Sequence, residues 1–277
     1  MCISPYLIIY RRAAQGGNIM QIKYTQYAVI EVTRRCNMQC RHCLRGDAQN
    51  VDISNEIIDR FFDGFADGAV IENVVFSGGE ITMNLDAIKY TLEVVKRKNI
   101  SVDAFYMVTN GKDVEKIQGL VTLSLEWWLY CKEYGNDLDD FSGIALSHDN
   151  FHEDVGNRAR NLLSGLSYFK VDDKDKDFTR IFLINEGRAK DLPATAWKKL
   201  EPLDQRLNVT VCPDGLELDD AEMYLNAVGD IVIGCDWSYE SQEKRAAVNV
   251  KTTEWPDHLL GHKYCRVDDT LVQEEAG

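Results

Sequence analysis

Three cysteines, Cys36, Cys40 and Cys43, lie close together near the start of the chain. Thiolates are soft ligands that suit iron–sulfur clusters or zinc, and three in one loop can ligate three irons of a cubane. The next cysteine is Cys131, so one iron of such a cluster is left open for a small-molecule ligand. Zinc is the alternative because His42 lies inside the motif, although zinc sites usually combine two cysteine pairs, or one pair with histidines.

Polar or glycine-containing clusters recur directly after short apolar runs. The sequence predicts strands over 27–32, 73–76, 102–108, 143–146 and 178–184. The first is followed by the cysteines, and the others are followed by SGGE (77–80), TNG (109–111), SHD (147–149) and NEGR (185–188). The carboxyl ends of parallel strands meet at one edge, where α/β proteins bind their ligands. We therefore expect these clusters to share one site.

Amphipathic helical segments separate most of these strands. They are predicted over 54–65, 85–98, 114–134 and 155–169. Such alternation indicates right-handed βαβ units and a parallel sheet. The pattern changes after about residue 205, where a strand is predicted over 207–212 and a hairpin over 223–226 and 230–233.

The order of these motifs along strand ends resembles the radical SAM superfamily. In that family a [4Fe–4S] cluster on the three cysteines reductively cleaves S-adenosylmethionine (SAM). The open iron chelates the methionine part of SAM, and the resulting 5′-deoxyadenosyl radical abstracts hydrogen from a substrate. The cofactor supplies the difficult chemistry and the protein positions it. The resemblance covers roughly residues 25–235 and implies an oxygen-sensitive enzyme.

The resemblance also assigns residues to SAM binding, namely Gly78, Gly79, Glu80, Asn110, Ser147, Asn185 and Arg188. Glu80 would receive the SAM ammonium, Ser147 would lie near the ribose, and Arg188 would grip the carboxylate with its fork of N–H groups. Two positions depart from the family pattern. His42 stands where an aromatic residue is usual, and Ile81 stands where proline is usual.

Three later cysteines, Cys212, Cys235 and Cys265, follow the predicted barrel. The segment from Gly229 to Cys235 resembles the opening of a SPASM or twitch extension, which binds auxiliary Fe–S clusters. Five residues separate this glycine and cysteine instead of four, and too few cysteines follow for two clusters. We predict a tentative auxiliary cluster on these three cysteines. The alternative is that they are ordinary core residues, since free cysteine buries well.

The expected fold is a partial (β/α)6 TIM-like barrel with a short, β-hairpin-containing C-terminal extension. Residues 1–21 form an uncertain N-terminal segment, 22–205 the radical SAM core, and 206–277 the SPASM/twitch-like remnant. No catalytic acid or base is assigned.

A net charge of −14 argues against nucleic acid and anionic membranes as partners. No apolar run reaches the roughly 20 residues of a membrane helix, and the first residues lack the pattern of a signal peptide. Clustered cysteines without an export signal predict a reducing cytoplasm.

The GRA-like segment at 187–189 and the extension remnant favour a peptide substrate. A small molecule or nucleotide is the alternative, because we see no N-terminal room for a leader-peptide recognition domain. A non-catalytic Fe–S or zinc-binding redox sensor is the alternative from another class. The enzyme would need a reductant such as flavodoxin or ferredoxin.

Overall fold

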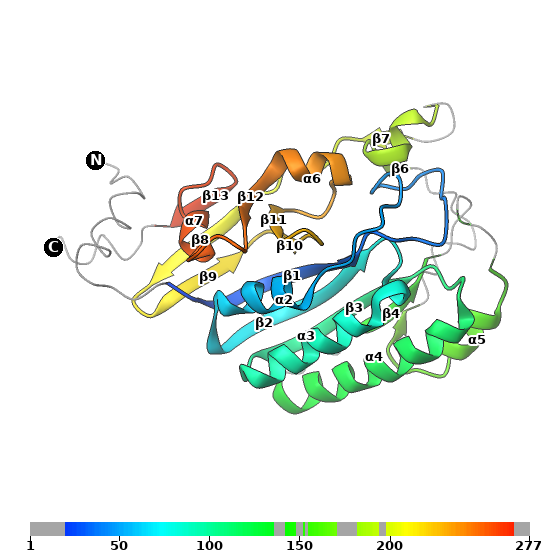
Figure 1. Cartoon of the computed structure of the whole chain (residues 1–277), viewed down its shortest axis with the longest axis horizontal. Coiled ribbons are helices and arrows are strands. Elements are labelled where there is room, and N and C mark those ends of the chain that lie inside the picture. The colour runs from blue at the N-terminus through cyan, green and yellow to red at the C-terminus, as the bar shows by residue number, and fades with distance from the viewer. Residues whose placement is uncertain are drawn as a thin grey trace.

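Alternating strands and helices build one mostly parallel sheet (Figure 1). The computed structural model describes residues 20–135, 142–147, 152, 155–170, 182–193 and 198–268. Within them, the strand order is β12-β11-β10-β1-β2-β3-β4-β5. Each pair from β1 to β5 is parallel, so the loops that follow these strands leave the sheet at the same edge. The first five strands are β1 (Ile22–Thr33), β2 (Phe65–Gly78), β3 (Ser101–Thr109), β4 (Gly143–Leu146) and β5 (Phe169–Lys170).

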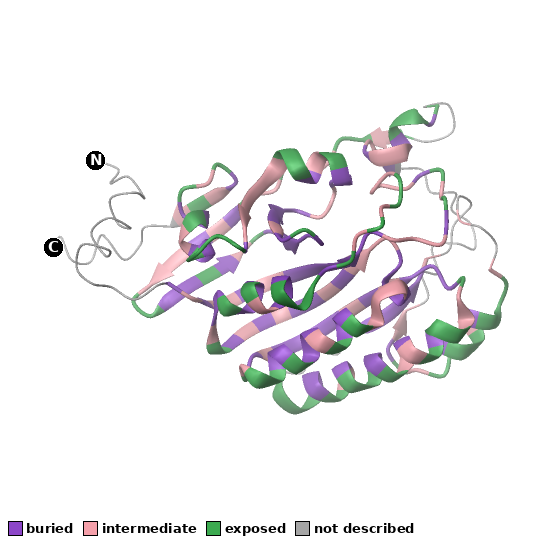
Figure 2. Ribbon diagram, viewed as in Figure 1, coloured by how far each residue is buried: buried purple, intermediate pink, exposed green. Residues whose placement is uncertain are grey.

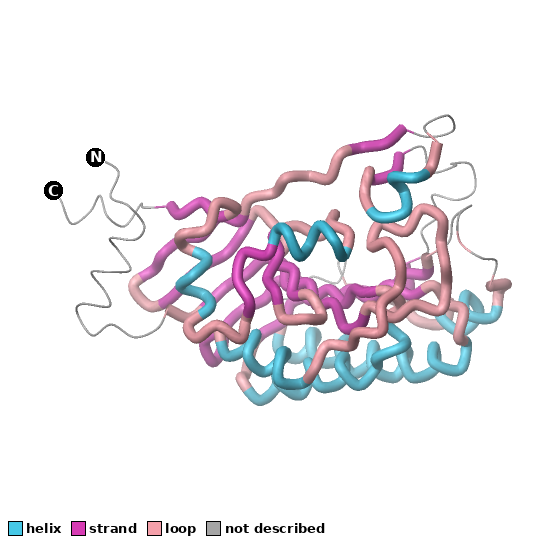
Figure 3. The backbone as a smooth tube through the Cα atoms, turned by 45° about the horizontal axis from the view of Figure 1, so that its top comes forward, coloured by secondary structure: helices cyan, strands magenta, loops and turns pink. Residues whose placement is uncertain are grey.

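The helices α2 (Asn55–Asp63), α3 (Leu85–Arg97) and α4 (Val114–Tyr134) lie together along one face of the sheet (Figure 3). Their apolar stripes are buried, as the burial colours of Figure 2 show. Ser54 caps α2 by accepting a hydrogen bond from the N–H of Ile57. On α4 the fully buried Trp127 packs edge-on against Phe76 of β2, with ring centres 5.2 Å apart. A short helix, α5 (Arg158–Leu163), follows β4.

The C-terminal strands continue the same sheet past β1. β10 (Met223–Leu225) pairs with β1 in parallel, and β9 (Gly215–Asp219) pairs with the start of β1. β10 then forms an antiparallel hairpin with β11 (Asp230–Ile233), turning at Gly229 with φ +97°. The remaining elements in this part are β8 (Leu207–Cys212), β12 (Ala246–Asn249), β13 (Cys265–Asp268), α6 (Tyr239–Arg245) and α7 (Trp255–Leu259).

The predicted fold class is confirmed as a mixed α/β structure with a mostly parallel sheet, with which a partial barrel is compatible. The helix predicted over 155–169 is wrong at its end, because α5 stops at Leu163 and β5 begins at Phe169. Of the strand predicted over 178–184, the described part is β6 (Phe182–Ile184). β6 pairs with β7 (Lys198–Leu200) in a separate two-stranded sheet instead of joining the main one. No helix in the described parts has the length and apolar character that a bilayer span requires.

Candidate active site

The three cysteines of the loop after β1 are all partly exposed. The loop folds back on itself, with the N–H of Cys43 donating to the carbonyl of Cys40 at 3.2 Å and the N–H of Met38 to Cys36 Sγ at 3.4 Å. Burial raises the pKa of Cys36, and the negative charges of Glu80, Cys43 and Cys40 raise it further. These effects place the three sulfur atoms and the end of β2 in one electrostatic neighbourhood.

Two glycines let the end of β2 lie directly against the cysteine loop. The N–H of Gly79 donates to the carbonyl of Thr33 at 2.9 Å, and the next N–H, that of Glu80, donates to the carbonyl of Arg35 at 2.8 Å. A Cβ at Gly78, whose φ is +149°, would lie 2.3 Å from the Thr33 oxygen, and one at Gly79 would lie 2.2 Å from the Arg35 oxygen. Only glycine fits at either position, because any side chain would push the loop away.

The carboxylate of Glu80 joins the ends of β2 and β3 beneath this loop. The residue is 2% exposed, and its Oε1 accepts bonds from the N–H of Thr82 (3.2 Å), the Thr82 hydroxyl (2.7 Å) and the Thr109 hydroxyl (2.6 Å). Its Oε2 accepts the N–H of Asn110 at 2.7 Å. Glu80 thus accepts four hydrogen bonds from the protein. The main role of Glu80 here is to hold two strand ends together.

Asn110 connects the end of β3 to the cysteine loop. It is 7% exposed, and its Nδ2 donates to Asn37 Oδ1 at 2.8 Å and lies 3.8 Å from Cys36 Sγ. At the next strand end, the N–H of Ser147 donates to the carbonyl of Thr109 at 2.8 Å. The structure therefore places Asn110 and Ser147 at the predicted edge. The other two residues of the SHD segment, 148 and 149, lie outside the described residues.

Arg188 lies on the cysteine loop, as the strand-end argument predicts, but it contacts protein groups. Its N–H donates to the carbonyl of Cys43 (2.9 Å), its Nη1 to the carbonyl of Cys40 (3.2 Å) and its Nε to Asp47 (2.8 Å). The other N–H groups of the Arg188 guanidinium are the ones left for the predicted hydrogen bonds to the SAM carboxylate. Asn185 donates to Glu201 at 3.0 Å in an exposed position beside β7, away from these contacts.

The three C-terminal cysteines do not come together. Cys265 lies beside Leu207 at the start of the parallel β8–β13 pair, whereas Cys212 ends β8 five residues later. Five residues of strand span roughly 16 Å. Cys212 pairs with Gly215, near the beginning of β1, while the carbonyl of Cys235 accepts a bond from an arginine of the cysteine loop. The structure gives no support to one auxiliary cluster on these three residues, because parallel pairing holds Cys212 and Cys265 at different ends of a strand.

Within the described residues, no three His, Cys, Asp or Glu side chains are arranged to hold a single ion. A zinc ion would need its sulfur ligands about 2.3 Å from one centre. A cubane instead gives each thiolate its own iron, which spaces the sulfurs further apart. Cys36, Cys40 and Cys43 thus fit a [4Fe–4S] cluster, with three soft ligands in one loop.

Sequence reasoning missed a buried charged network behind the loop. Glu31, on β1, is 0% exposed, and its Oε1 accepts bonds from Arg34 Nε (2.7 Å) and the N–H of Ala227 (3.0 Å). Its Oε2 accepts the Tyr224 hydroxyl (2.7 Å) and Gln242 Nε2 (3.2 Å). The signal available was a carboxylate inside an otherwise apolar strand, three residues before an arginine. This network ties the base of the loop to β10 and α6.

A second missed residue is Arg45, two positions after the last cysteine. Its guanidinium lies 4.7 Å from the ring centre of Tyr224, and its Nη1 donates to the carbonyls of Cys235 (2.8 Å) and Trp237 (2.6 Å). Its Nη2 reaches Ser77 Oγ at 3.5 Å, just before the glycine pair. The C-terminal segment is therefore fixed directly to the cysteine loop.

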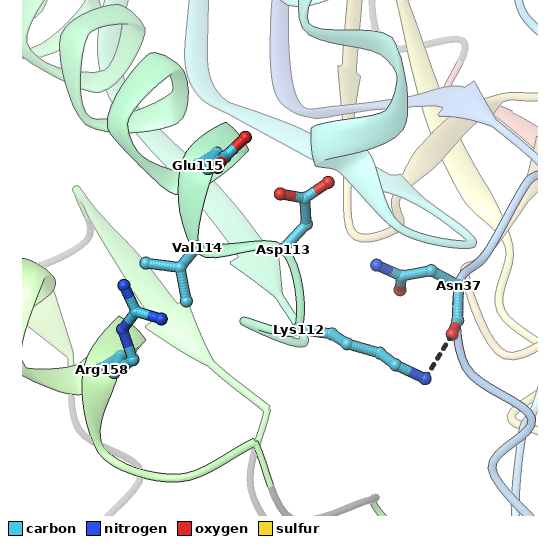
Figure 4. Close-up of a pocket in the computed structure, with 6 residues that line it drawn as sticks. All are labelled: Asn37, Lys112, Asp113, Val114, Glu115 and Arg158. Atoms are coloured by element: carbon cyan, nitrogen blue, oxygen red, sulfur yellow. Dashed lines mark hydrogen bonds between the residues drawn. The ribbon is translucent and has the colours of Figure 1, made fainter.

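A pocket of about 440 Å³ opens beside the loop (Figure 4). It is lined by Asn37, Lys112, Asp113, Val114, Glu115 and Arg158. The Nζ of Lys112 donates to the carbonyl of Asn37 at 2.9 Å, which closes one wall of the pocket against the residue next to Cys36. Of the residues predicted to bind SAM, none is in this lining, so the pocket is a neighbour of the site and not its centre.

A family model matches the part of the chain that holds this site. Residues 30–163, which include the three cysteines, β2, β3 and β4, match the model of the radical SAM superfamily. The chain therefore carries a region similar to the radical SAM superfamily, which spans just under half of its 277 residues. The superfamily implies a [4Fe–4S] cluster and SAM as cofactors. These are the cofactors that the cysteine loop and the glycine pair fit.

One curated relative of this chain is the putative peptide biosynthesis protein YydG of Bacillus subtilis (strain 168). It is 25% identical over 133 residues, which are 47% of this chain and 37% of YydG. The matched part thus spans little more than a third of that relative's length.

Two solved structures share the fold. Both are native anSMEcpe with bound AdoMet, one with the Cp18Cys peptide (12% identity, TM-score 0.51) and one with the Kp18Cys peptide (13% identity, TM-score 0.52). Each comparison covers 87% of this chain, and 82% and 81% of the respective solved chains. At this level of identity the likeness shows the fold alone.

Proposed function

We propose that this chain is a radical SAM enzyme that modifies a peptide by hydrogen abstraction. The observation that carries the proposal is the convergence of three strand ends on one cysteine loop. The end of β2 contacts it through Gly79, the end of β3 through Asn110, and the 3₁₀ turn after β6 through Arg188. A [4Fe–4S] cluster and SAM, when bound, supply a 5′-deoxyadenosyl radical.

Different residues around the loop would bind the cluster and SAM. Cys36, Cys40 and Cys43 would hold the cluster. The backbone of Gly78 and Gly79 and the carboxylate of Glu80 would face the SAM ammonium, since a carboxylate complements a positive charge. Asn110, Ser147 and Arg188 lie at the same edge and would orient the rest of the molecule.

Three comparisons support a peptide as the substrate. YydG is described as a putative peptide biosynthesis protein, and both anSMEcpe structures contain a bound peptide beside AdoMet. The proposed electron source is an external reductant such as flavodoxin or ferredoxin. The charge of −14 gives no support to a nucleic-acid substrate.

Deuterium transfer tests the peptide proposal. The reconstituted enzyme would be given SAM, reductant and a deuterated form of a short peptide encoded beside its gene. We expect deuterium in the 5′-deoxyadenosine that forms, because the radical takes its hydrogen from the substrate. Abundant 5′-deoxyadenosine without deuterium, together with an unmodified peptide, would contradict the proposal and favour a small-molecule or nucleotide substrate.

A further inference from the structure

Tyr239, the first residue of α6, carries a hydroxyl that the function above does not use. The residue is 3% exposed, and its hydroxyl oxygen is buried without a hydrogen-bond partner among the described residues. A buried polar group without a partner costs free energy, so native proteins seldom keep one without a reason. Tyr239 therefore calls for an explanation.

The phenol lies against the base of the cysteine loop. Its backbone N–H donates to the carbonyl of Arg45 at 3.1 Å, and the guanidinium of Arg34 lies 4.6 Å from its ring centre. Those two arginines flank the cysteine motif, two residues before Cys36 and two residues after Cys43. Burial raises the pKa of Tyr239, so the hydroxyl keeps its proton and is a donor at neutral pH.

The carboxylate of Glu31, which lies near this phenol, already accepts hydrogen bonds from other groups. Glu31 accepts four hydrogen bonds, from Arg34, Ala227, Tyr224 and Gln242. A carboxylate offers about four lone-pair sites, so it has none left for a fifth donor. The phenol is fixed by Arg34 on its face and by Arg45 at its backbone, which prevents it from turning toward solvent.

We infer that the Tyr239 hydroxyl donates a hydrogen bond to a sulfur atom of the iron–sulfur cluster. This inference rests on the proposed cluster at Cys36, Cys40 and Cys43. Hydrogen bonds to cluster sulfurs are one of the means by which a protein sets a cluster's reduction potential. Such a bond is stronger in the reduced, more negative state, so it eases reduction. Tyr239 is thus a positioning and tuning residue that the C-terminal segment contributes to the cluster.

The Tyr239→Phe variant removes only the oxygen atom, and its effect on the loaded enzyme is the first test. At a fixed solution potential we expect the ratio of reduced to oxidised cluster to fall three- to tenfold, measured by redox titration with electron paramagnetic resonance detection. A tenfold fall corresponds to about 59 mV for a one-electron couple. In deuterated water, an exchangeable proton coupled to the reduced wild-type cluster should be lost in the variant.

Thermal stability gives a second test that does not depend on activity. Without the cluster, Tyr239→Phe should melt at or above the wild-type temperature, because it removes an unpartnered buried hydroxyl. With the cluster it should melt below the wild type. Tyr130→Phe is the matched control, since the buried Tyr130 hydroxyl donates to the carbonyl of Ile100 at 2.7 Å, on the helical side of the sheet. That control should melt lower in both states and keep the wild-type potential.

Two results would overturn the inference: a Tyr239→Phe cluster with the wild-type potential and proton couplings, or a variant that is destabilised equally with and without the cluster. In either case a wild type that binds about four irons leaves the proposed function intact. A wild type that binds no cluster overturns both.

Discussion

At the scale of single residues, the site depends on backbone atoms that approach each other closely. Gly78 and Gly79 lie where a Cβ would be little more than 2 Å from a carbonyl oxygen of the loop. The sequence motif indicated this need for glycine. It did not indicate that Glu80 would be occupied by four protein donors, because that depends on Thr109 and Asn110, which lie about thirty residues further along the chain.

Substituting Gly79 with alanine tests this close approach. We expect Gly79→Ala to destabilise the fold by about 2–4 kcal/mol and to lower iron incorporation, because the loop must move off the end of β2. Urea unfolding and iron analysis would measure both effects. Gly165→Ala is the control, since a Cβ there meets no atom within 4 Å, and it should change stability by less than about 0.5 kcal/mol. Equal effects of the two variants would contradict the argument.

Alkaline pH tests the buried thiol of Cys131, on the inner side of α4. Burial raises the pKa of the Cys131 thiol to about 12. The folded state therefore holds its proton at a pH where the unfolded state has lost it, and stability falls as pH rises from 9 toward 12. This thiol contributes a slope of up to about 1.4 kcal/mol per pH unit. Cys131→Ala should show a shallower fall in urea unfolding between pH 9 and 11, and an unchanged slope would contradict the assignment.

At the scale of elements, β1 has neighbours from both halves of the chain. It pairs with β2 on one side, and with β9 and then β10 on the other. The periodic segments α3, α4 and β4 could be predicted from the sequence, because their apolar spacing and caps are local. The pairing of β10 with β1 could not, since nothing local encodes a parallel contact across nearly two hundred residues. The two-residue β5 and the short α6 and α7 are too brief for periodicity to reveal.

Truncation tests whether residues 206–277 are an appendage or part of the sheet. A chain ending at residue 205 lacks both β9 and β10, so one edge of β1 loses its partners and apolar residues are uncovered. We expect it to lose its cooperative thermal transition and to bind a hydrophobic dye. A chain ending at residue 268, which keeps every described element, should melt cooperatively. A cooperative, wild-type-like melt of the shorter chain would show that the core folds alone.

At the scale of the whole molecule, the cysteine loop and the candidate SAM-binding residues after β2 and β3 lie at one end of the sheet, and the rest of the fold holds them in place. Strand ends contact the cysteine loop, and Arg45 and Glu31 bond the loop and its base to the C-terminal segment. The shared edge of the parallel strands was predictable from their order. The closing of the loop by α6 was not, because Glu31, Arg34 and Gln242 appear in the sequence as ordinary polar residues.

The separation of the later cysteines predicts a single cluster per chain. We expect the Cys212→Ser/Cys235→Ser/Cys265→Ser variant to bind about four irons, as the wild type does, because these thiols lie apart in the described structure. Iron and sulfide analysis after anaerobic reconstitution would check this. A wild type with about eight irons that falls to four in the variant would contradict it.

The most direct measurement is 5′-deoxyadenosine formation from SAM by the reduced, reconstituted chain. The wild type should bind about four irons and form 5′-deoxyadenosine, whereas the Cys36→Ala/Cys40→Ala/Cys43→Ala variant should do neither. A variant that keeps its iron, or a loaded and reduced wild type that leaves SAM intact, would contradict the assignment of the cluster to these three cysteines.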